Sequence, residues 1–266
     1  MFLKIVRKYI SILKINLLQA LQYKINTFFL LSIILVPPLA YFFLWKTIYT
    51  QTEIIGDYKL SELITYYIIS SFFLEARPHV SWEIAILIKD GRFSKYITKP
   101  FNHLLFEFLA SCAYLLLWWI FAILGVIFLF FILKNYIILP YGLLPFFLSF
   151  LFAILGGVLS FIIEYTFILL AFWVEKPFAF LRVWDLIIRF LSGYIIPLDL
   201  LPFKNIFLFL PFKYISFLPA RIFIGKININ IFNELFILLF WIIIFYFISQ
   251  IIFYLGRKIY TAPGSI

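Results

Sequence analysis

Charged side chains are rare in this sequence, and three of them lie inside long apolar stretches where a charge needs a partner. Asp185 and Arg189 are four residues apart, so on a helix they share a face at the spacing of an ion pair. Glu164 lies alone deep in another apolar run, where a carboxylate needs a cation, a proton or water. Two roles fit these residues, a structural ion pair or a polar path for a transported solute, and the spacing leaves both open.

Sequence motifs for catalysis or nucleotide binding are missing. The two histidines, His79 and His103, have no metal-binding spacing, and the single cysteine, Cys112, has no second cysteine to pair with. No serine stands in a G-x-S-x-G motif. Gly225-Lys226 lacks the upstream glycine and the following hydroxyl of a phosphate-binding P-loop. We therefore expect this chain to bind no metal or cofactor and to catalyse no reaction of its own.

The composition places much of the chain in lipid. Hydrophobic residues make up 65% of the 266 residues, aromatic residues 23% and charged residues only 13%. A soluble fold of this size cannot bury so many apolar side chains, and the apolar runs lack the alternation of β-barrel strands. The net charge of +10 does not indicate nucleic acid, because its placement follows the expected membrane topology. We predict an all-α integral membrane protein with one transmembrane domain over residues 1–266.

Six transmembrane helices are predicted. The second one is short and carries several polar residues, so we expect it to face protein rather than lipid. The fourth contains Gly156, Gly157 and Ser160, a face of small residues suited to close packing. The predicted spans are residues 25–49, 60–76, 104–133, 140–174, 183–201 and 235–255.

Three further segments complete the predicted arrangement. Residues 1–24 place basic side chains on one helical arc, which predicts an amphipathic helix at the membrane interface. Residues 202–230 hold prolines between apolar runs too short to cross, which predicts re-entrant or interfacial helices at the outer surface. Most lysines and arginines lie in residues 1–24, in residues 77–103 and at the span ends on the same side. The positive-inside rule therefore places both termini and the 77–103 loop in the cytoplasm.

The most charge-dense break in the apolar sequence runs from Ser81 to His103. Five apolar residues, 84–88, precede the turn signal Asp90-Gly91, and a basic strip then leads to Lys99-Pro100 and the next span. This order predicts a short helix, a turn and a re-entry into the membrane. A docking element for a soluble cytoplasmic partner and an ordinary basic loop that only fixes topology both fit this pattern.

Three pieces of the sequence resemble the ABC-2 type exporter permeases, in particular the branch found beside daunorubicin-resistance-type ATPases. DGRFSKYITKP, residues 90–100, resembles that branch's G-x-x-x-x-x-L-x-[KR]-P loop, with Ile97 in place of the usual leucine. Residues 192–226 resemble its G-x-x-x-P-L-x-x-[FL]-P…L-P-F…P…G-K region, and GRKIY at 256–260 resembles its G-x-[RK]-x-Y end. The likeness extends over nearly the whole chain.

The resemblance implies a transport subunit that is energised by another protein. The chain would form a dimer with itself or a sister permease in a prokaryotic cytoplasmic (inner) membrane. Two copies of a separate ABC ATPase, which bind ATP and Mg, would dock beneath it, and the N-terminal helix would also meet the ATPase. Residues 82–99 would be the coupling helix. The implied coupling residues are Trp82, Glu83, Asp90, Gly91, Arg92, Phe93, Tyr96, Lys99 and Pro100.

The resemblance also implies a substrate path between the first, second and fifth spans of two subunits. The substrate would be an amphiphilic or lipid-like molecule that leaves the cytoplasm or the inner leaflet. Two other functions stay open. An ion-coupled secondary transporter would use Glu164 as its proton site, although internal repeats are expected there and none is visible. A membrane-embedded lipid-modifying enzyme would place Glu75, Glu164 or Asp185 at its reaction centre.

Overall fold

The computed structural model describes residues 24–98, 101–226 and 230–260, and these residues form helices without a β-strand. An isolated bridge joins Ile55 to Tyr58 in a loop. The predicted all-α fold is therefore confirmed. The predicted interfacial helix lies outside the described residues, apart from Lys24, which begins the first described helix.

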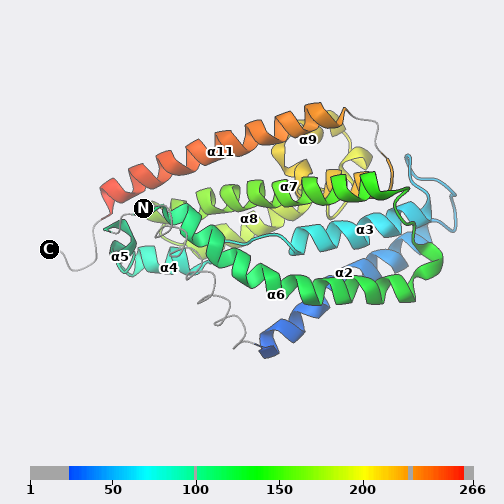
Figure 1. Cartoon of the computed structure of the whole chain (residues 1–266), viewed down its shortest axis with the longest axis horizontal. Coiled ribbons are helices and arrows are strands. Elements are labelled where there is room, and N and C mark those ends of the chain that lie inside the picture. The colour runs from blue at the N-terminus through cyan, green and yellow to red at the C-terminus, as the bar shows by residue number, and fades with distance from the viewer. Residues whose placement is uncertain (1–23, 99–100, 227–229, 261–266) are drawn as a thin grey trace.

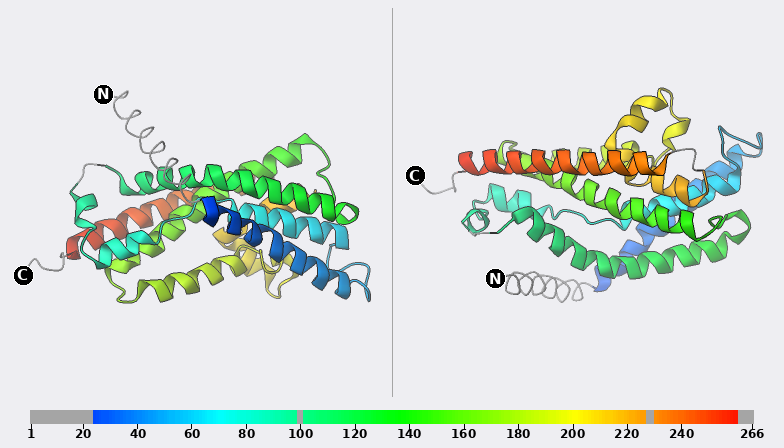
Figure 2. Two further views of the ribbon diagram at one scale, coloured as in Figure 1. Left: turned by 90° about the horizontal axis from the view of Figure 1, so that it is seen from below. Right: turned by 45° about the horizontal axis from the view of Figure 1, so that its top comes forward.

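The described residues contain six helices of 15 residues or more, which run along the length of the molecule (Figures 1 and 2). They are α2 (Lys24–Ile48), α3 (Leu60–Glu75), α6 (His103–Ile132), α7 (Leu143–Leu169), α8 (Pro177–Leu191) and α11 (Ile231–Ile259). The shorter helices are α4 (Glu83–Lys89), α5 (Ser94–Ile97), α9 (Lys204–Phe209) and α10 (Phe217–Phe223). Tight turns are η1 (Lys134–Tyr136), η2 (Leu170–Phe172), η3 (Leu198–Leu200) and η4 (Pro211–Tyr214). In Figure 1, α4, α5 and the end of α11 lie at one end, and the α2–α3 loop lies at the other.

Two of the described helices are long and apolar enough to cross a membrane: α7 together with η2, and α11. Helix α6 adds a third span if its two parts, His103–Leu116 and Trp118–Ile132, which are bent by 41°, count as one. Helices α3 and α8, with 16 and 15 residues, are shorter than the roughly 20 residues that a straight span needs. The count of six spans therefore stays a prediction, although helices occur in all six predicted regions.

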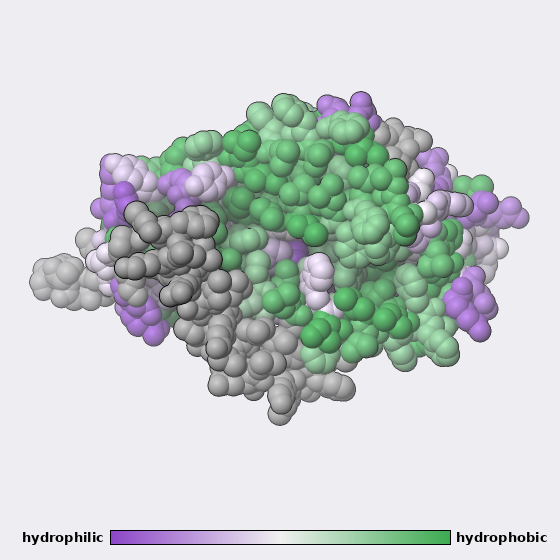
Figure 3. Space-filling view, viewed as in Figure 1, coloured by the Kyte–Doolittle hydropathy of each residue, from purple (hydrophilic) through white to green (hydrophobic). Residues whose placement is uncertain are grey.

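The surface of the molecule has an apolar middle and polar ends. Figure 3 shows a broad hydrophobic face between two ends where the polar residues gather. Large apolar side chains such as Phe131 on α6 and Phe236 on α11 are exposed on the outside of the helices. An apolar surface of this extent belongs in lipid, with the long axis of the molecule across the bilayer.

Helix α3 is the buried centre of the fold. All its residues from Leu63 to Glu75 are buried, which confirms the prediction that this short, polar helix faces protein. The hydroxyls of Thr65 and Ser71 bond to the backbone carbonyls of Ser61 and Tyr67, so burial leaves them satisfied. After Glu75 the chain leaves the helix and runs through residues 76–82 as non-helical backbone to α4 (Figure 1). This crossing of the molecule is therefore half helix and half irregular chain.

Helix α8 corrects the predicted fifth span, which was expected at residues 183–201. The helix begins at Pro177 and ends at Leu191. Pro177 occupies the first turn, where proline fits because that backbone N–H has no partner within the helix. Gly193, two residues after the helix ends, has a φ of 79°, which suits glycine far better than residues with a side chain.

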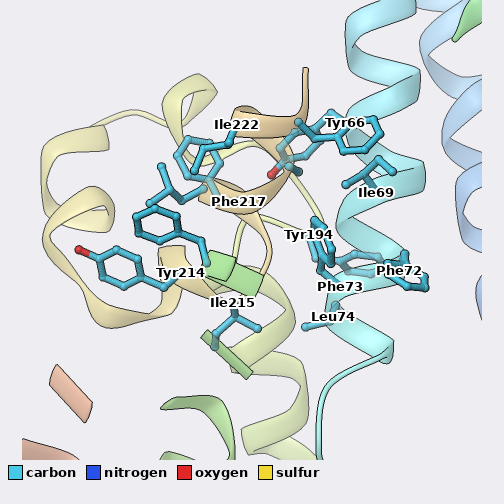
Figure 4. Close-up of a cluster of buried hydrophobic side chains, with 14 of the residues drawn as sticks. Tyr66, Ile69, Phe72, Phe73, Leu74, Tyr194, Tyr214, Ile215, Phe217 and Ile222 are labelled. Atoms are coloured by element: carbon cyan, nitrogen blue, oxygen red, sulfur yellow. The ribbon is translucent and has the colours of Figure 1, made fainter. Parts of the chain in front are cut away.

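Residues 192–224 fold back against α3 and α7 as short helices and turns. Figure 4 shows side chains of this segment facing side chains of α3 in one apolar cluster. Helix α9 has no buried residue, whereas residues 213–220 and 222–224 are buried. The small residues of α7 permit this approach, as predicted. A Cβ on Gly156 would overlap the backbone carbonyl of Tyr214, and Ser149 donates a hydrogen bond to the Pro219 carbonyl at 2.9 Å.

Candidate functional site

The described members of the predicted coupling set lie together at the end of the molecule that carries α4 and α5. The turn between the two helices depends on Gly91, whose φ is 77°. Asp90 and Arg92 flank it, are both exposed, and form an ion pair at 2.6 Å. Glu83, at the start of α4, is also exposed. Charged groups thus cover the outer face of this element, which is the face that a soluble partner can reach.

Two further members of the set point towards the protein, and two cannot be placed. The half-buried Trp82 lies near Phe178 of α8, with ring centres 6.5 Å apart. Tyr96 is half-buried, and burial raises the pKa of its phenol, so it stays neutral at physiological pH. Lys99 and Pro100 lie outside the described residues.

Phe93 anchors this element to the rest of the protein. Its side chain is fully buried, and its ring centre lies 4.9 Å from that of His103, at the start of α6. The same ring lies 5.6 Å from Phe172, at the end of the α7–η2 segment, and 6.3 Å from Phe253 in α11. A single side chain between α4 and α5 therefore touches the ends of three long helices.

The end of α11 holds this anchor through Tyr260. The backbone N–H of Phe93 donates a hydrogen bond to the Tyr260 hydroxyl at 3.1 Å and another to the Leu87 carbonyl at 2.9 Å. Burial raises the pKa of Tyr260, so its hydroxyl stays protonated. Gly256, one turn earlier, packs so closely on the ring of Phe172 that a side chain there would overlap it. Two of the three sequence pieces that carried the resemblance, 90–100 and 256–260, thus meet in space.

His103 belongs to the same contact region, and its surroundings explain its burial. Its Nδ1 lies 2.9 Å from the Tyr165 hydroxyl on α7, and its Nε2 lies 3.4 Å from Glu107. The contact with Tyr165 joins the first turn of α6 to α7 next to Phe93. Among the described residues no three His, Cys, Asp or Glu side chains are placed to hold a metal ion. His103 packs against Phe93, Tyr165 and Phe253.

Glu164, predicted to need a partner, pairs with Arg77. Arg77 NH1 lies 3.2 Å from Glu164 Oε2, and the two side chains are 3% and 9% exposed. Arg77 lies in the irregular segment after α3, and His79 of the same segment has Nδ1 3.7 Å from the same carboxylate oxygen. The irregular segment after α3 therefore supplies the side chains that contact the buried carboxylate of α7. Neither Arg77 nor His79 was among the predicted site residues.

The predicted pair of Asp185 and Arg189 is present and has a third member. Arg189 Nε lies 3.0 Å from Asp185 Oδ2, and its NH1 lies 2.6 Å from Oε1 of Glu75, the last residue of α3. Glu75 is buried, whereas Asp185 is 41% exposed. The pairing inside α8 follows from the spacing of four residues, but the link to α3 depends on tertiary packing.

A cavity of about 740 Å³ lies between α2, α3 and the turn that follows α8. Its lining includes Tyr41, Leu44, Trp45 and Tyr67, and the rings of Tyr41 and Tyr67 are stacked at 4.1 Å. Asp199 adds a carboxylate, one oxygen of which pairs with Arg221 at 3.1 Å. The cavity therefore combines aromatic walls with few polar groups, the lining typical of sites for small, partly apolar ligands.

Comparison with known proteins places the chain in a family. A family model described as "ABC-2 family transporter protein" matches residues 35–264. No curated protein matches the chain. The matched range contains the α4–α5 element, residues 192–226 and the 256–260 end, which are the pieces that resemble ABC-2 permeases. The chain belongs to the ABC-2 family of transporter proteins.

Proposed function

We propose that this chain is the transmembrane permease subunit of an ATP-driven ABC exporter. A separate ATPase subunit, present in two copies and binding ATP and Mg, energises it, and the chain itself binds no cofactor. It works as a dimer, with itself or with a sister permease, in a prokaryotic inner membrane with both termini in the cytoplasm. Family membership supports the permease role and the partnership with an ABC ATPase, and the basic residues support the orientation.

The observation that carries this proposal is the burial of Phe93 beneath an exposed, charged turn. Asp90 and Arg92 offer a docking face, and Phe93 on the next turn of chain is in contact with α6, with η2 after α7, and with α11. A displacement of the turn would therefore be transmitted through Phe93 directly to three long helices. This is the arrangement that a coupling element needs.

ATP-driven closure of the two ATPases would move α4 and α5, and the permease dimer would change between two packings. In thermodynamic terms ATP binding favours one packing over the other, so transport follows from a shift in population. Close-packed helices suit such a change because their interfaces tend to adopt discrete arrangements rather than deform continuously.

The cavity beside α2 and α3 supports an amphiphilic or lipid-like substrate. Its lining includes residues of the first, second and fifth predicted spans, the spans that the family resemblance implies as the walls of the path between two subunits. Tyr41, Trp45 and Tyr67 offer apolar ring faces, and Asp199 and Tyr67 offer polar atoms for a head group. We infer that the substrate passes this cavity on its way out of the cytoplasm or the inner leaflet.

Co-purification tests the proposal directly. The chain is co-expressed with the stand-alone ABC ATPase encoded nearest to its gene, and the complex is isolated through a tag on the permease. We expect a stable complex whose ATP hydrolysis depends on this chain and is lost when Arg92 and Asp90 are replaced together by alanine. An ATPase that neither co-purifies nor responds to the chain would contradict the proposal.

The buried carboxylates give the other two functions little support. Glu164 is neutralised by Arg77, and Glu75 by Arg189, so each carboxylate has an ion-pair partner and a structural role is sufficient. An ion-coupled transporter needs a carboxylate that gains and loses a proton during each cycle, and an enzyme needs one that faces its substrate.

A further inference from the structure

A second hollow lies between α3, α6 and α7, apart from the cavity just described. It measures about 320 Å³, near the lower end of the roughly 300–1,000 Å³ that is usual for ligand pockets. Leu116 of α6 and Ile154 of α7 line it and are 59% and 53% exposed. The hollow is therefore a groove that opens sideways, on the apolar face of the molecule where lipid would lie.

Arg77 lies at one end of this groove. A Cβ built on Gly157 would lie 3.6 Å from the Cβ of Arg77, so the two residues share one level along α7. Phe150, which also lines the groove, is seven residues earlier on α7, or about 10 Å away along the helix. Between these levels the groove is lined by Phe72, Trp119 and other apolar side chains.

The guanidinium of Arg77 has a donor to spare. Its NH1 bonds to Glu164, but its Nε is buried and has no hydrogen-bond partner among the described residues. A buried donor without an acceptor costs about 1–3 kcal/mol, so it calls for a ligand or a water. The indole N–H of Trp119, whose ring lines the groove, already donates a hydrogen bond to the Ala76 carbonyl at 2.8 Å.

The charge already present around Arg77 indicates which kind of acceptor can bind its Nε. Glu164 already compensates the positive charge of Arg77, so a neutral oxygen such as an ester carbonyl satisfies Nε without adding a second buried anion. The backbone at this point agrees with a ligand site. Residues 76–82 are irregular within an otherwise helical bundle, and irregular backbone at membrane depth occurs where it is covered by protein or lines a cavity.

We propose that this groove holds one acyl chain of a membrane phospholipid, whose ester carbonyl accepts a hydrogen bond from Arg77 Nε. A single hydrocarbon chain fits the groove's volume of about 320 Å³ and its apolar lining. The lipid comes from the leaflet on the α4–α5 side, because Arg77 reaches from the break in α3 towards Glu164, further along α7 in that direction. This inference does not depend on the transport function.

Photo-crosslinking in membranes tests the lipid site. The full chain is reconstituted in phosphatidylcholine vesicles that contain a phosphatidylcholine with a diazirine in one acyl chain, and labelled residues are identified by peptide mass spectrometry. We expect labelling concentrated on residues 108–119 and 150–158 and reduced severalfold by Ala153→Phe, which fills the groove. Leu151→Phe, on the exposed side of the same helix, is the matched control and leaves labelling unchanged. If Ala153→Phe fails to insert, Cys112→Phe narrows the groove from α6 instead.

A second probe tests the role of Arg77. An ether-linked phosphatidylcholine with the same diazirine chain lacks the carbonyl, so it should label the groove severalfold less than the ester-linked probe. In the double variant Arg77→Met/Glu164→Met the two probes should label equally, because the ion pair and the spare donor are both removed. Labelling spread evenly over the exposed faces of α6 and α11 would overturn the groove assignment. Equal labelling of the unmodified protein by ester and ether probes would overturn the hydrogen bond.

Discussion

At the scale of residues, two of the ion pairs inside the apolar bundle lie at the C-terminal end of α3. Glu75 is paired with Arg189 of α8, and Arg77 with Glu164 of α7. These contacts join segments that are 114 and 87 residues apart in the sequence. Removing one member of such a pair leaves an uncompensated charge in a low-dielectric interior, which is the costly outcome. Replacing one member of a pair should therefore lower the free energy of unfolding more than replacing both members with apolar residues.

The triad of Glu75, Asp185 and Arg189 predicts an asymmetric response. Arg189→Gln should lower the free energy of unfolding by about 2 kcal/mol, less than a fully buried pair because Arg189 is partly exposed. Asp185→Asn should cost below about 1 kcal/mol, since Asp185 is largely accessible. Thermal unfolding of the detergent-solubilised protein measures both changes.

A charge swap between Asp185 and Arg189 provides the check on this triad. If the two residues formed an isolated pair, the swap would restore stability. Because Glu75 also contacts Arg189, an aspartate at 189 faces a buried carboxylate, so we expect no rescue until Glu75→Gln is added. Full rescue by the swap alone would show that Glu75 takes no part.

The pair of Arg77 and Glu164 predicts a separation of stability from function. Glu164→Gln should lower the unfolding temperature, because Arg77 stays buried without its counter-ion. The ATP hydrolysis and transport of the protein that does fold should persist, since the carboxylate has a structural role. Reconstituted transport per inserted molecule measures this. Loss of transport at normal stability would instead favour the ion-coupled mechanism with Glu164 as its proton site.

At the scale of elements, the α4–α5 segment is a small platform that packs on the long helices through Phe93 and the buried side chains of α4. Its outer side carries Asp90 and Arg92, and its inner side carries Phe93, held by the Tyr260 hydroxyl. Reversing an outer charge should alter docking without altering the fold. Disturbing the turn itself should alter both.

Arg92→Glu and Gly91→Pro separate these two effects. With Arg92→Glu the protein should insert and elute normally, whereas the partner ATPase should no longer be stimulated, because the docking face has changed sign. Lys204→Glu, an exposed lysine on α9, is the matched control. Gly91→Pro should also lower stability, because proline cannot adopt the φ of 77° at this turn. Normal stimulation by both variants would rule out α4–α5 as the coupling element.

Sequence patterns predicted the elements better than their contacts. The apolar runs located α2, α3, α6, α7 and α11 to within a few residues, since a long helix in lipid is read from hydropathy alone. The start of helix α8 was placed six residues too late, because its first two turns carry Pro177 and Arg182 and resemble a polar turn in the sequence. The contact between Phe93 and Tyr260 spans 167 residues, and no spacing rule predicts it. In the sequence, only the resemblance of residues 256–260 to the family motif indicated a role for Tyr260.

At the scale of the whole molecule, the polar ends and the apolar middle define a transmembrane orientation. The α4–α5 end carries the loop that should meet the ATPase, and the α2–α3 loop lies at the opposite end (Figure 1). From the distribution of basic residues we propose that the α4–α5 end faces the cytoplasm. The two sides can be distinguished because Cys112 is the only cysteine in the chain.

Cysteine labelling in intact cells tests this orientation. In a Cys112→Ser background, Glu53→Cys in the α2–α3 loop should react with a membrane-impermeant maleimide, and Lys95→Cys in α5 should react only after the cells are opened. Both native residues are exposed, so a difference in labelling reports sidedness rather than burial. The reverse pattern would place the coupling platform outside the cell and exclude contact with a cytoplasmic ATPase.

The most direct test of the account is whether Phe93 transmits ATP binding to the distant cavity. In the Cys112→Ser background, Leu44→Cys introduces a thiol on the exposed edge of that cavity, and its reaction rate with N-ethylmaleimide is measured in the ATPase complex with and without a non-hydrolysable ATP analogue. We predict that the analogue changes this rate severalfold. Phe93→Ala should abolish the change while the complex still forms, and the exposed Phe131→Ala should preserve it. An undiminished change in Phe93→Ala would contradict the account.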